Sequence, residues 1–222
     1  MTNQLIVMAR NPFKSQVKSR LGKVLGTEVA RGVYTRLVYE TLLTLLSEQC
    51  GNIQITLTLE AEHGIPIFKE AFPELNVTSQ CRGNIGKRMW HALQTAFDQN
   101  AEKAVLIGSD IPGIHWDIIR QAFDLIDEET IAIGPAQDGG YYLIGMQSPG
   151  QNIFQDILWS SNSVLAGTIS NITQLGLMPG FLPTCLDIDF VEDLLQWQGQ
   201  LLNEPPLDSG GKEVSNNGKK EE

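Results

Sequence analysis

The stretch of sequence that does most to define the fold covers residues 5–23 and reads LIVMARNPFKSQVKSRLGK. Its first five residues are all apolar, which is typical of a strand buried in a parallel sheet. A basic loop follows, and over residues 27–49 apolar residues recur with the spacing of an amphipathic helix. A buried strand, a loop and a helix in this order predict the first unit of an α/β fold.

Strands and helices continue to alternate along the chain. Hydrophobic patterns predict further strands at residues 53–59, 75–78, 104–108, 130–134, 141–146 and 186–189. They predict further helices at residues 65–72, 85–100, 116–125, 152–158, 162–175 and 191–202. This alternation indicates βαβ units and a mostly parallel sheet.

The length of 222 residues fits one domain with a tail. We expect the domain to cover residues 1–203. Residues 204–222 are rich in Pro, Gly, Ser, Asn and charged residues. Because this tail has little to bury, it is predicted to be disordered and removable without loss of the folded core.

The acidic composition narrows the class of partner. The formal net charge is −10 and the pI is about 4.8, whereas a nucleic-acid-binding domain usually carries a basic face. We therefore expect no binding to nucleic acid or to anionic membranes. The three cysteines form no CxxC pair, which suits free thiols in a reducing compartment. No apolar run approaches the roughly 20 residues of a membrane span, so a cytoplasmic protein is predicted.

Candidate ligand-binding residues follow the predicted strands, at the edge where open α/β sheets bind their ligands. Arg10, Lys18 and Arg20 come after the first strand, and cations on a loop before a helix favour phosphate. A solvated basic loop is the alternative, and exposed loop cations would add little to stability. Ser109 and Asp110 follow a later buried strand, where Asp110 is placed either to hold a metal or to cap the next helix.

Two longer loops also lie at predicted strand ends. Residues 80–86 contain two glycines, which allow close backbone approach to a flat ligand or simply form turns. Residues 134–142 read GPAQDGGYY and are longer than a simple hairpin turn requires. Tyr141 and Tyr142 would offer ring faces and hydroxyls to an acceptor, and a structural turn with core aromatics is the alternative.

Asp187 and Asp189 lie two residues apart on a predicted strand and would share one face. One of them could complete a metal site with Asp110. The three histidines show no HxH or HExxH pattern, which argues against a zinc site. The absence of GxSxG and of GxxxxGK[ST] argues against a serine hydrolase and a P-loop.

Four blocks of the sequence carry a resemblance to one family. They read MARNPFKSQVKSRLG, QCRGNIGKRM, LIGSDIPG followed by IGPAQDGGYYLIGM, and LDIDFVEDL. Together they span about residues 4–202 and resemble the bacterial radical-SAM/selenodomain-associated transferases, some of which are assigned to arsenosugar biosynthesis. More distantly the chain resembles the 2-phospholactate and molybdenum-cofactor guanylyltransferases. The first block departs from many members by having Phe-Lys-Ser-Gln at residues 13–16 in place of Pro-Gly.

The resemblance implies an α/β fold of the glycosyltransferase-A, or nucleotide-diphospho-sugar transferase, type. This is a three-layer α/β/α sandwich around a mostly parallel twisted sheet. The donor nucleotide is expected at Ala9, Arg10, Lys18, Arg20, Gln80, Gly83, Asn84 and Ser109. The acceptor is expected at Asp138, Gly139, Gly140, Tyr141 and Tyr142. The divalent cation, Mg²⁺ or Mn²⁺, is expected at Asp110, Asp187 and Asp189.

These residues predict a metal-dependent transferase that uses a nucleotide-activated donor. Glycosyl transfer to a small-molecule acceptor is favoured, with Asp110 and Asp138 as catalytic residues and Asp138 as the base toward the acceptor hydroxyl. A nucleotidyltransferase that releases pyrophosphate is the alternative, because the same phosphate cradle serves both reactions. A non-catalytic nucleotide-binding module is a third possibility. The sequence indicates neither the acceptor, the donor base nor an oligomeric state.

Overall fold

A computed structural model describes residues 2–13, 16–48, 51–148 and 152–203 of the chain. The strands are β1 (Thr2–Ala9), β2 (Ile53–Leu59), β3 (Asn76–Ser79), β4 (Ala101–Gly108), β5 (Thr130–Pro135), β6 (Tyr141–Met146) and β7 (Met178–Phe181). The helices are α1 (Ser19–Leu25), α2 (Thr27–Ser47), α3 (Ile65–Ala71), α4 (Ile85–Asp98), α5 (Trp116–Leu125), α6 (Val164–Gln174) and α7 (Val191–Asn203), with a 3-10 turn at Glu62–Gly64.

The strands form one seven-stranded sheet in the order β3-β2-β1-β4-β6-β5-β7. Strands β1 to β4 are parallel, β6 runs antiparallel to both β4 and β5, and β7 is parallel to β5. The predicted mostly parallel sheet is therefore confirmed. Because β1 and β4 are neighbours, the loops that follow Ala9 and Gly108 leave the sheet side by side.

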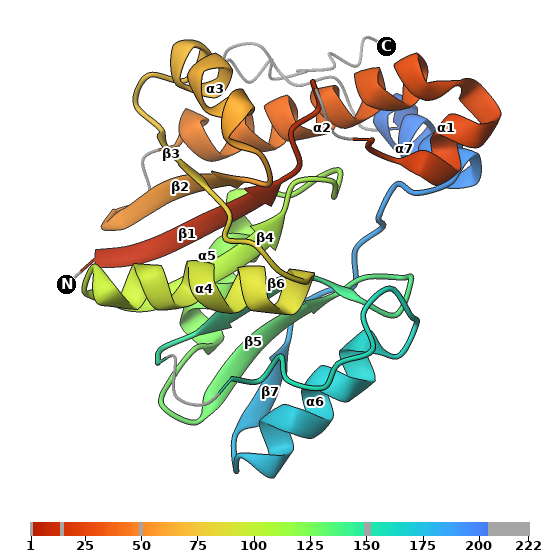
Figure 1. The fold of residues 1–222 in the computed structure, drawn as a ribbon. Helices are drawn as coiled ribbons and strands as arrows, with labels where there is room; N and C mark the ends of the chain where they lie inside the picture. The colour runs from red at the N-terminus through yellow and green to blue at the C-terminus, as the bar shows by residue number, and fades with distance from the viewer. Residues whose placement is uncertain (1, 14–15, 49–50, 149–151, 204–222) are drawn as a thin grey trace, which may run out of the picture.

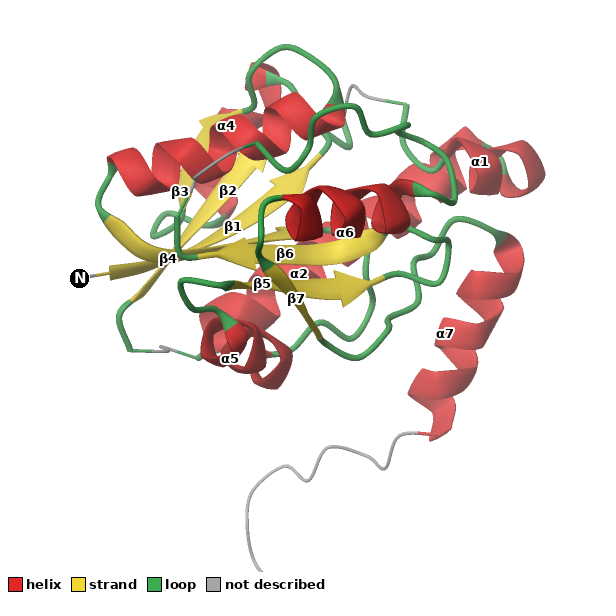
Figure 2. Ribbon diagram, turned by 90° about the horizontal axis from the view of Figure 1, so that it is seen from below, coloured by secondary structure: helices red, strands yellow, loops and turns green. Residues whose placement is uncertain are grey.

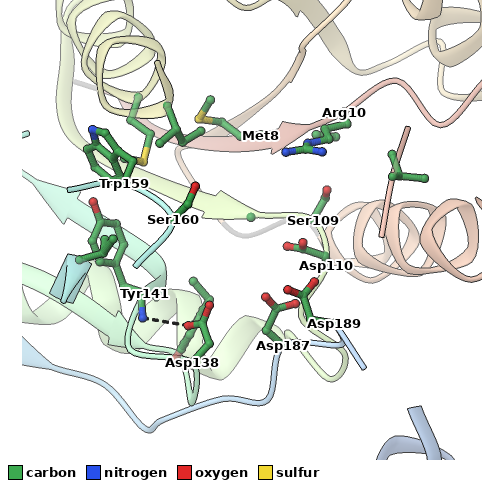
Figure 3. A pocket seen from close by; sticks show the side chains of 18 of the residues that line it. Met8, Arg10, Ser109, Asp110, Asp138, Tyr141, Trp159, Ser160, Asp187 and Asp189 are labelled. Carbon is green, nitrogen blue, oxygen red and sulfur yellow. Dashed lines mark hydrogen bonds between the residues drawn. The ribbon is translucent and has the colours of Figure 1, made fainter. Parts of the chain in front are cut away.

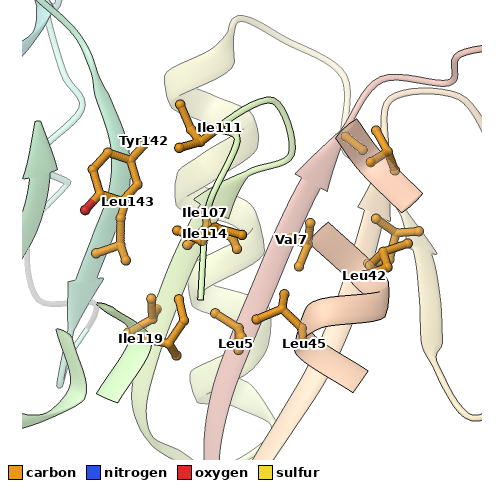
Figure 4. Packing of buried hydrophobic residues seen from close by; sticks show 14 of the residues in the cluster. Leu5, Val7, Leu42, Leu45, Ile107, Ile111, Ile114, Ile119, Tyr142 and Leu143 are labelled. Carbon is orange, nitrogen blue, oxygen red and sulfur yellow. The ribbon is translucent and has the colours of Figure 1, made fainter. Parts of the chain in front are cut away.

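Helices cover both faces of this sheet (Figures 1 and 2). Side chains of α2, α3 and α5 share one core cluster with alternate residues of β1 and β4, including Leu5, Val7 and Ile107 (Figure 4). Side chains of α4 and α6 share a second cluster with the opposite residues of the same strands, such as Ile6 and Leu106. This arrangement is the expected three-layer sandwich, and it explains why residues 5–9 of the first strand are all apolar.

A third, smaller cluster joins the two ends of the described chain. Leu21 of α1, Ala30 and Leu37 of α2, and Trp197 of α7 are buried together. Figure 1 shows α7 lying beside α1 and α2, far in sequence from both. This packing brings residues 187–189, which precede α7, to the loop after β1.

Most predicted elements are present, and four predictions are wrong. Residues 19–25, expected as loop, form α1, a short helix in which only Leu21 is buried. Residues 152–158, expected as helix, form turns. The edge strand β7 contains Pro and Gly, so it was missed. Residues 186–189 form no strand, and the only nearby bridge among the described residues pairs Ala136 with Cys185.

The remaining predictions about the whole chain have mixed outcomes. No helix in the described part of the chain is long and apolar enough to cross a membrane. Cys81 and Cys185 are free thiols, as expected, whereas Cys50 lies outside the described residues. The tail predicted over residues 204–222 also lies outside them.

Candidate functional site

A pocket of about 920 Å³ opens where β1 and β4 end (Figure 3). Its volume suits a small molecule or nucleotide. The sequence-predicted residues that line it are Ala9, Arg10, Lys18, Arg20, Gln80, Asn84, Ser109, Asp110, Asp138, Gly140, Tyr141, Tyr142, Asp187 and Asp189. Gly83 and Gly139 do not line it. The structure thus brings the predicted residues to one cavity at the edge of the sheet that open α/β folds use.

One end of this pocket, here the charged end, contains Arg10, Lys18, Arg20, Asp110, Asp187 and Asp189. The Lys18 ammonium donates to Asp110 Oδ2 at 2.9 Å and to Asp187 Oδ1 at 2.8 Å. It also donates to Asp189 Oδ1 at 3.2 Å, and Arg20 donates to Asp189 Oδ2 at 2.8 Å. The three carboxylates predicted to share a metal therefore converge on one nitrogen atom.

The position of Lys18 corrects the sequence prediction. Its side chain is only 3% exposed, so it is not an exposed loop cation. Its backbone is left-handed, with φ 46° and ψ 51°, directly before α1. This turn sends the side chain inward, toward residues that follow β4 and precede α7.

Burial and mutual repulsion perturb the charges at this end. Burial by itself lowers the pKa of Lys18, but Asp110, Asp187 and Asp189 together raise it above its ordinary value. Burial, and next the charge of Asp110, raise the pKa of Asp187 to about 7 despite the opposing effect of Lys18. The three carboxylates therefore outnumber the two cations paired with them, Lys18 and Arg20, and perturbed pKa values of this kind are typical of functional sites.

The other two predicted cations are accessible from the pocket. The Arg20 side chain is 53% exposed, and its guanidinium lies 5.2 Å from the centre of the Phe190 ring. The Arg10 side chain is 56% exposed and donates to the Gln16 carbonyl at 3.2 Å. Because both side chains are already more than half exposed, both can contact an anionic group in the pocket.

Tyr34, on α2, also lines the pocket, and the sequence reading missed it. The backbone N–H of Arg10 donates to the Tyr34 hydroxyl at 2.8 Å, and that hydroxyl lies 3.0 Å from Ser109 Oγ. Burial is the main reason that the pKa of Tyr34 rises to about 12. Tyr34 thus joins the loop after β1 to the loop after β4. The sequence did not identify it as a site residue, because its position in the helical pattern predicts only a core residue.

Gln80 lines the pocket, but hydrogen bonds within the protein occupy its amide. Its Nε2 donates to the carbonyls of Ala9 at 3.1 Å and Thr58 at 2.9 Å. Its Oε1 accepts from Arg88 at 3.0 Å. Gln80 therefore connects the ends of β1, β2 and β3, and Ala9 contributes its carbonyl to that connection.

The neighbouring loop residues serve the start of α4. The Asn84 side chain accepts a hydrogen bond from the backbone of Lys87 at 2.9 Å, as a helix N-cap does. Gly83 has φ 138°, and a side chain there would come within 2.8 Å of Lys87. Gly83 is therefore explained by backbone conformation, at a position outside the pocket lining.

The turn that carries Asp138 is closed tightly. Asp138 Oδ1 accepts from the backbone of Gly140 at 2.8 Å, and the carboxylate itself faces the pocket (Figure 3). Gly139 has φ 88°, and a Cβ there would lie 2.4 Å from the Asn162 carbonyl oxygen. Gly139 thus supports the turn from outside the pocket, where the loop before α6 packs against it.

Tyr141 and Tyr142 point to opposite faces of β6. Tyr142 donates to the Pro183 carbonyl at 3.0 Å and belongs to the core shown in Figure 4. Its ring lies so close to Gly134 that a Cβ there would be 2.4 Å away. The Tyr141 side chain instead lies beside Trp159 at the pocket (Figure 3). Both predicted acceptor tyrosines line the pocket, but only the Tyr141 ring lies beside Trp159, and the Tyr141 hydroxyl is buried.

We call the second end of the pocket the aromatic end; it contains Tyr141, Trp159, Ser160, Ser161 and Asn162. Four of these residues come from the turns that precede α6. None of the four was assigned to the site from the sequence, because helices were expected over residues 152–158 and 162–175 with only a short connection between them. The polar Ser-Ser-Asn-Ser run over residues 160–163 was the signal for turns.

No set of three or more His, Cys, Asp or Glu side chains in the described part of the chain is arranged around a centre open to a metal ion. The acidic set that comes nearest in chemistry is Asp110, Asp187 and Asp189. Their oxygens point at the Lys18 ammonium, which occupies the centre between them.

Comparison with protein families gives one match. The family described as an uncharacterized protein conserved in bacteria, DUF2064, matches residues 42–161, which is more than half of the chain. A comparison with curated proteins gives no match.

Several solved structures have the same fold. A candidate nucleotide-diphospho-sugar transferase from Desulfovibrio desulfuricans G20 is 31% identical, with a TM-score of 0.78 over 87% of this chain and 85% of that one. A nucleotidyl transferase from Methanothermobacter thermautotroptrophicus is 13% identical, with a TM-score of 0.59 over 90% and 98%. The 4-diphosphocytidyl-2C-methyl-D-erythritol synthase from Anaerococcus prevotii DSM 20548 is 11% identical, with a TM-score of 0.56 over 90% and 96%. The last two matches extend the likeness of fold across nucleotide-dependent transferases.

Proposed function

Since this chain belongs to the bacterial DUF2064 family, we propose that it is a nucleotide-dependent transferase, and specifically a metal-dependent glycosyltransferase acting on a small-molecule acceptor. The Desulfovibrio relative, at 31% identity, supports the general class of nucleotide-dependent transferase. The further step to glycosyl transfer, and the link to radical-SAM-associated transferases, rest on the resemblance of the four sequence blocks.

The observation that carries the proposal is the convergence of Asp110, Asp187 and Asp189 beside Arg20 at one end of a nucleotide-sized pocket. These carboxylates are 19–34% exposed and outnumber the two cations paired with them, so they repel one another unless a ligand completes the charge balance. A cation held by carboxylates, together with a diphosphate held by arginines, would supply that balance. A structural ion-pair network would have no need of an adjoining cavity.

The carboxylates also have the ligand chemistry of the metal that such a transferase would use, although the Lys18 ammonium lies between them. Three aspartates supply hard oxygen ligands, which Mg²⁺ and Mn²⁺ prefer. All three oxygens lie within 3.2 Å of one point, the Lys18 nitrogen. When bound there in place of that ammonium, a divalent cation would neutralise charge on the leaving diphosphate.

The chain's own residues divide the remaining tasks. Arg10 and Arg20 would hold the donor phosphates from the rim of the charged end. Asp138 would take the proton of the acceptor hydroxyl. The oxygen of that hydroxyl would then bond to the anomeric carbon of the donor sugar. The bond from that carbon to the diphosphate oxygen breaks, and its electron pair leaves with the nucleoside diphosphate.

A product assay tests this proposal against its alternatives. The protein would be incubated with nucleotide sugars and with nucleoside triphosphates, each with Mn²⁺ and a panel of sugar acceptors. Release of nucleoside diphosphate supports glycosyl transfer, whereas release of pyrophosphate identifies a nucleotidyltransferase. Thermal stabilisation by nucleotides without any product would identify a binding module.

Binding by the arginines has its own control within the chain. Arg20→Ala should weaken binding of a nucleoside diphosphate with Mn²⁺ by roughly 10- to 150-fold, as expected for one lost charged hydrogen bond. Lys87→Ala removes an exposed cation that does not line the pocket and should leave the affinity unchanged. Equal affinities for both variants and the wild type would remove Arg20 from the donor site.

A further inference from the structure

The aromatic end of the pocket has a chemistry of its own, different from that of the charged end. Its lining residues, Tyr141, Trp159, Ser160, Ser161 and Asn162, are aromatic or neutral and polar, and none of them is a cation. The pocket's arginines and Lys18 belong to other parts of the lining, and Arg88 is paired with Glu60 at 3.2 Å. The charged side chain that Figure 3 places between the two ends is Asp138.

The residues of this end form a packed wall of the pocket, because two glycines allow neighbouring segments to pack closely against it. A Cβ on Gly86, in the first turn of α4, would lie 2.4 Å from the Trp159 ring, so the indole packs directly on that turn. A Cβ on Gly139 would lie 2.4 Å from the Asn162 carbonyl. The Trp159 ring also packs against Phe154, with 6.4 Å between ring centres. The wall is therefore fastened both to α4 and to the turn that carries Asp138.

Polar groups on the wall remain available to a ligand. The indole N–H of Trp159 and the side chains of Ser160 and Asn162 make no hydrogen bond to another residue in the described part of the chain. Ser160 has a left-handed backbone, with φ 66°, and its side chain projects at the pocket in Figure 3. An indole face beside several hydroxyl and amide groups suits a ring with an apolar face and hydroxyls at its edge.

We propose that the aromatic end is the acceptor subsite and that it selects an uncharged polyhydroxy compound, a sugar or sugar-like ring, over its phosphorylated form. The proposal rests on the proposed function, since it takes Asp138 as the base for the acceptor hydroxyl. A ring held on Trp159 would present its edge to Asp138, whose turn is packed against the same loop. A phosphate at this end would meet the Asp138 carboxylate and no cation among the five residues of the aromatic end.

Indole NMR signals of the full-length protein provide the test. The chain has four tryptophans, and the Trp159 signal is assigned with Trp159→Phe. A panel of methyl glycosides should shift the Trp159 signal in a saturable manner. The corresponding sugar phosphates should bind roughly tenfold more weakly or worse, since a modest charge repulsion corresponds to such a factor. Asp138→Asn should narrow that gap.

Kinetics then separates a subsite from a merely structural tryptophan. Trp159→Ala should raise the acceptor KM about tenfold while leaving the donor KM unchanged. Trp197→Phe, on α7 and outside the pocket lining, is the matched control and should change neither constant.

Three outcomes would overturn the proposal. In the first, sugar phosphates bind as tightly as the glycosides. In the second, a free nucleoside shifts the Trp159 signal, which would mean that this end holds the nucleobase. In the third, no glycoside in the panel shifts the signal. Failure of the proposed function would look different. Glycosides would then still bind at Trp159, but no nucleotide sugar would yield a nucleoside diphosphate.

Discussion

The two ends of the pocket are held together by different forces. At the charged end, the Lys18 ammonium lies within 3.2 Å of three carboxylates that come from distant parts of the chain. At the aromatic end, Gly86 and Gly139 allow contacts that no side chain would permit. One end depends on charge balance, and the other depends on close packing.

This difference indicates which end of the pocket should rearrange when a ligand binds. An ion-pair cluster can be rearranged by a ligand that carries the appropriate charge, because the exchange keeps the balance. Close packing has no such substitute, and its contacts are lost when they are disturbed. We therefore expect cation and donor binding to remodel the charged end and to leave the aromatic end in place.

The largest expected effect comes from Lys18. Lys18→Met leaves three carboxylates around an apolar side chain, and loss of one partner from a buried ion pair costs about 3–5 kcal/mol. The loss should appear in denaturant unfolding at pH 8 with a chelator, and Mn²⁺ or a lower pH should restore part of it. Lys23→Met, at an exposed position on α1, should have no such effect. A Lys18 variant as stable as the wild type would mean that the charged end does not depend on charge balance.

The next effect concerns turnover. Asp110→Asn should reduce the rate of nucleoside diphosphate release by about 100- to 1,000-fold, the range found when one electrostatic contact to a transition state is removed. The measurement is made with Mn²⁺ at saturating nucleotide sugar. Asp124→Asn, an exposed acid on α5, should leave the rate unchanged. An Asp110 variant with full activity would exclude the carboxylate cluster from the reaction.

The aromatic end should respond to packing changes. Gly139→Ala combines a strained φ of 88° with a contact of 2.4 Å to the Asn162 oxygen, and should cost about 1–3 kcal/mol. That corresponds to roughly 2–4 °C in Tm for each kcal/mol at this chain length. Gly113→Ala has a positive φ, 75°, with nothing within 4 Å, so it gives the cost of a positive φ without a close contact. Equal losses for both variants would show that the contact with the loop before α6 adds no stability.

The smallest expected effect is a pH dependence of the charged end. Because the folded pKa of Asp187, about 7, lies above its unfolded value of 3.8, the folded state binds the extra proton between these values. This contribution is fully present below the unfolded pKa and is lost as pH rises through the folded pKa of about 7. Unfolding of Asp187→Asn with a chelator should lack this fall between pH 5 and pH 8. An identical pH slope in wild type and variant would contradict it.

Several features of the fold could be predicted because their signals are local. The continuous apolar run at residues 5–9 indicates a strand buried on both faces, and it is one. Elements with weak hydrophobic patterns were missed, because their local signal is too weak to predict them. The helix α1 buries only Leu21, and β7 interrupts its pattern with Pro179 and Gly180.

The residues of the candidate site also fall into those that local sequence signals predict and those that depend on tertiary packing. Polar residues that follow strands, such as Asp110, could be assigned to the ligand edge because parallel strands end together. The expectation that Asp187 and Asp189 share one face of a strand gave a useful pairing for the wrong reason. They form no strand, and α7 packing brings both side chains to Lys18.

The sequence by itself determined most of the strands and helices, the acidic balance of the chain and the polar residues that follow β1 and β4, because hydrophobic period and residue type are properties of short segments. Only the tertiary structure decided that Lys18 is buried among three aspartates and that Trp159 faces the same pocket. Those contacts depend on the adjacency of β1 and β4, on the left-handed turn at Lys18 and on the close approach of loops at Gly86 and Gly139. Such contacts join positions far apart in the chain, and packing of the whole domain sets their distances.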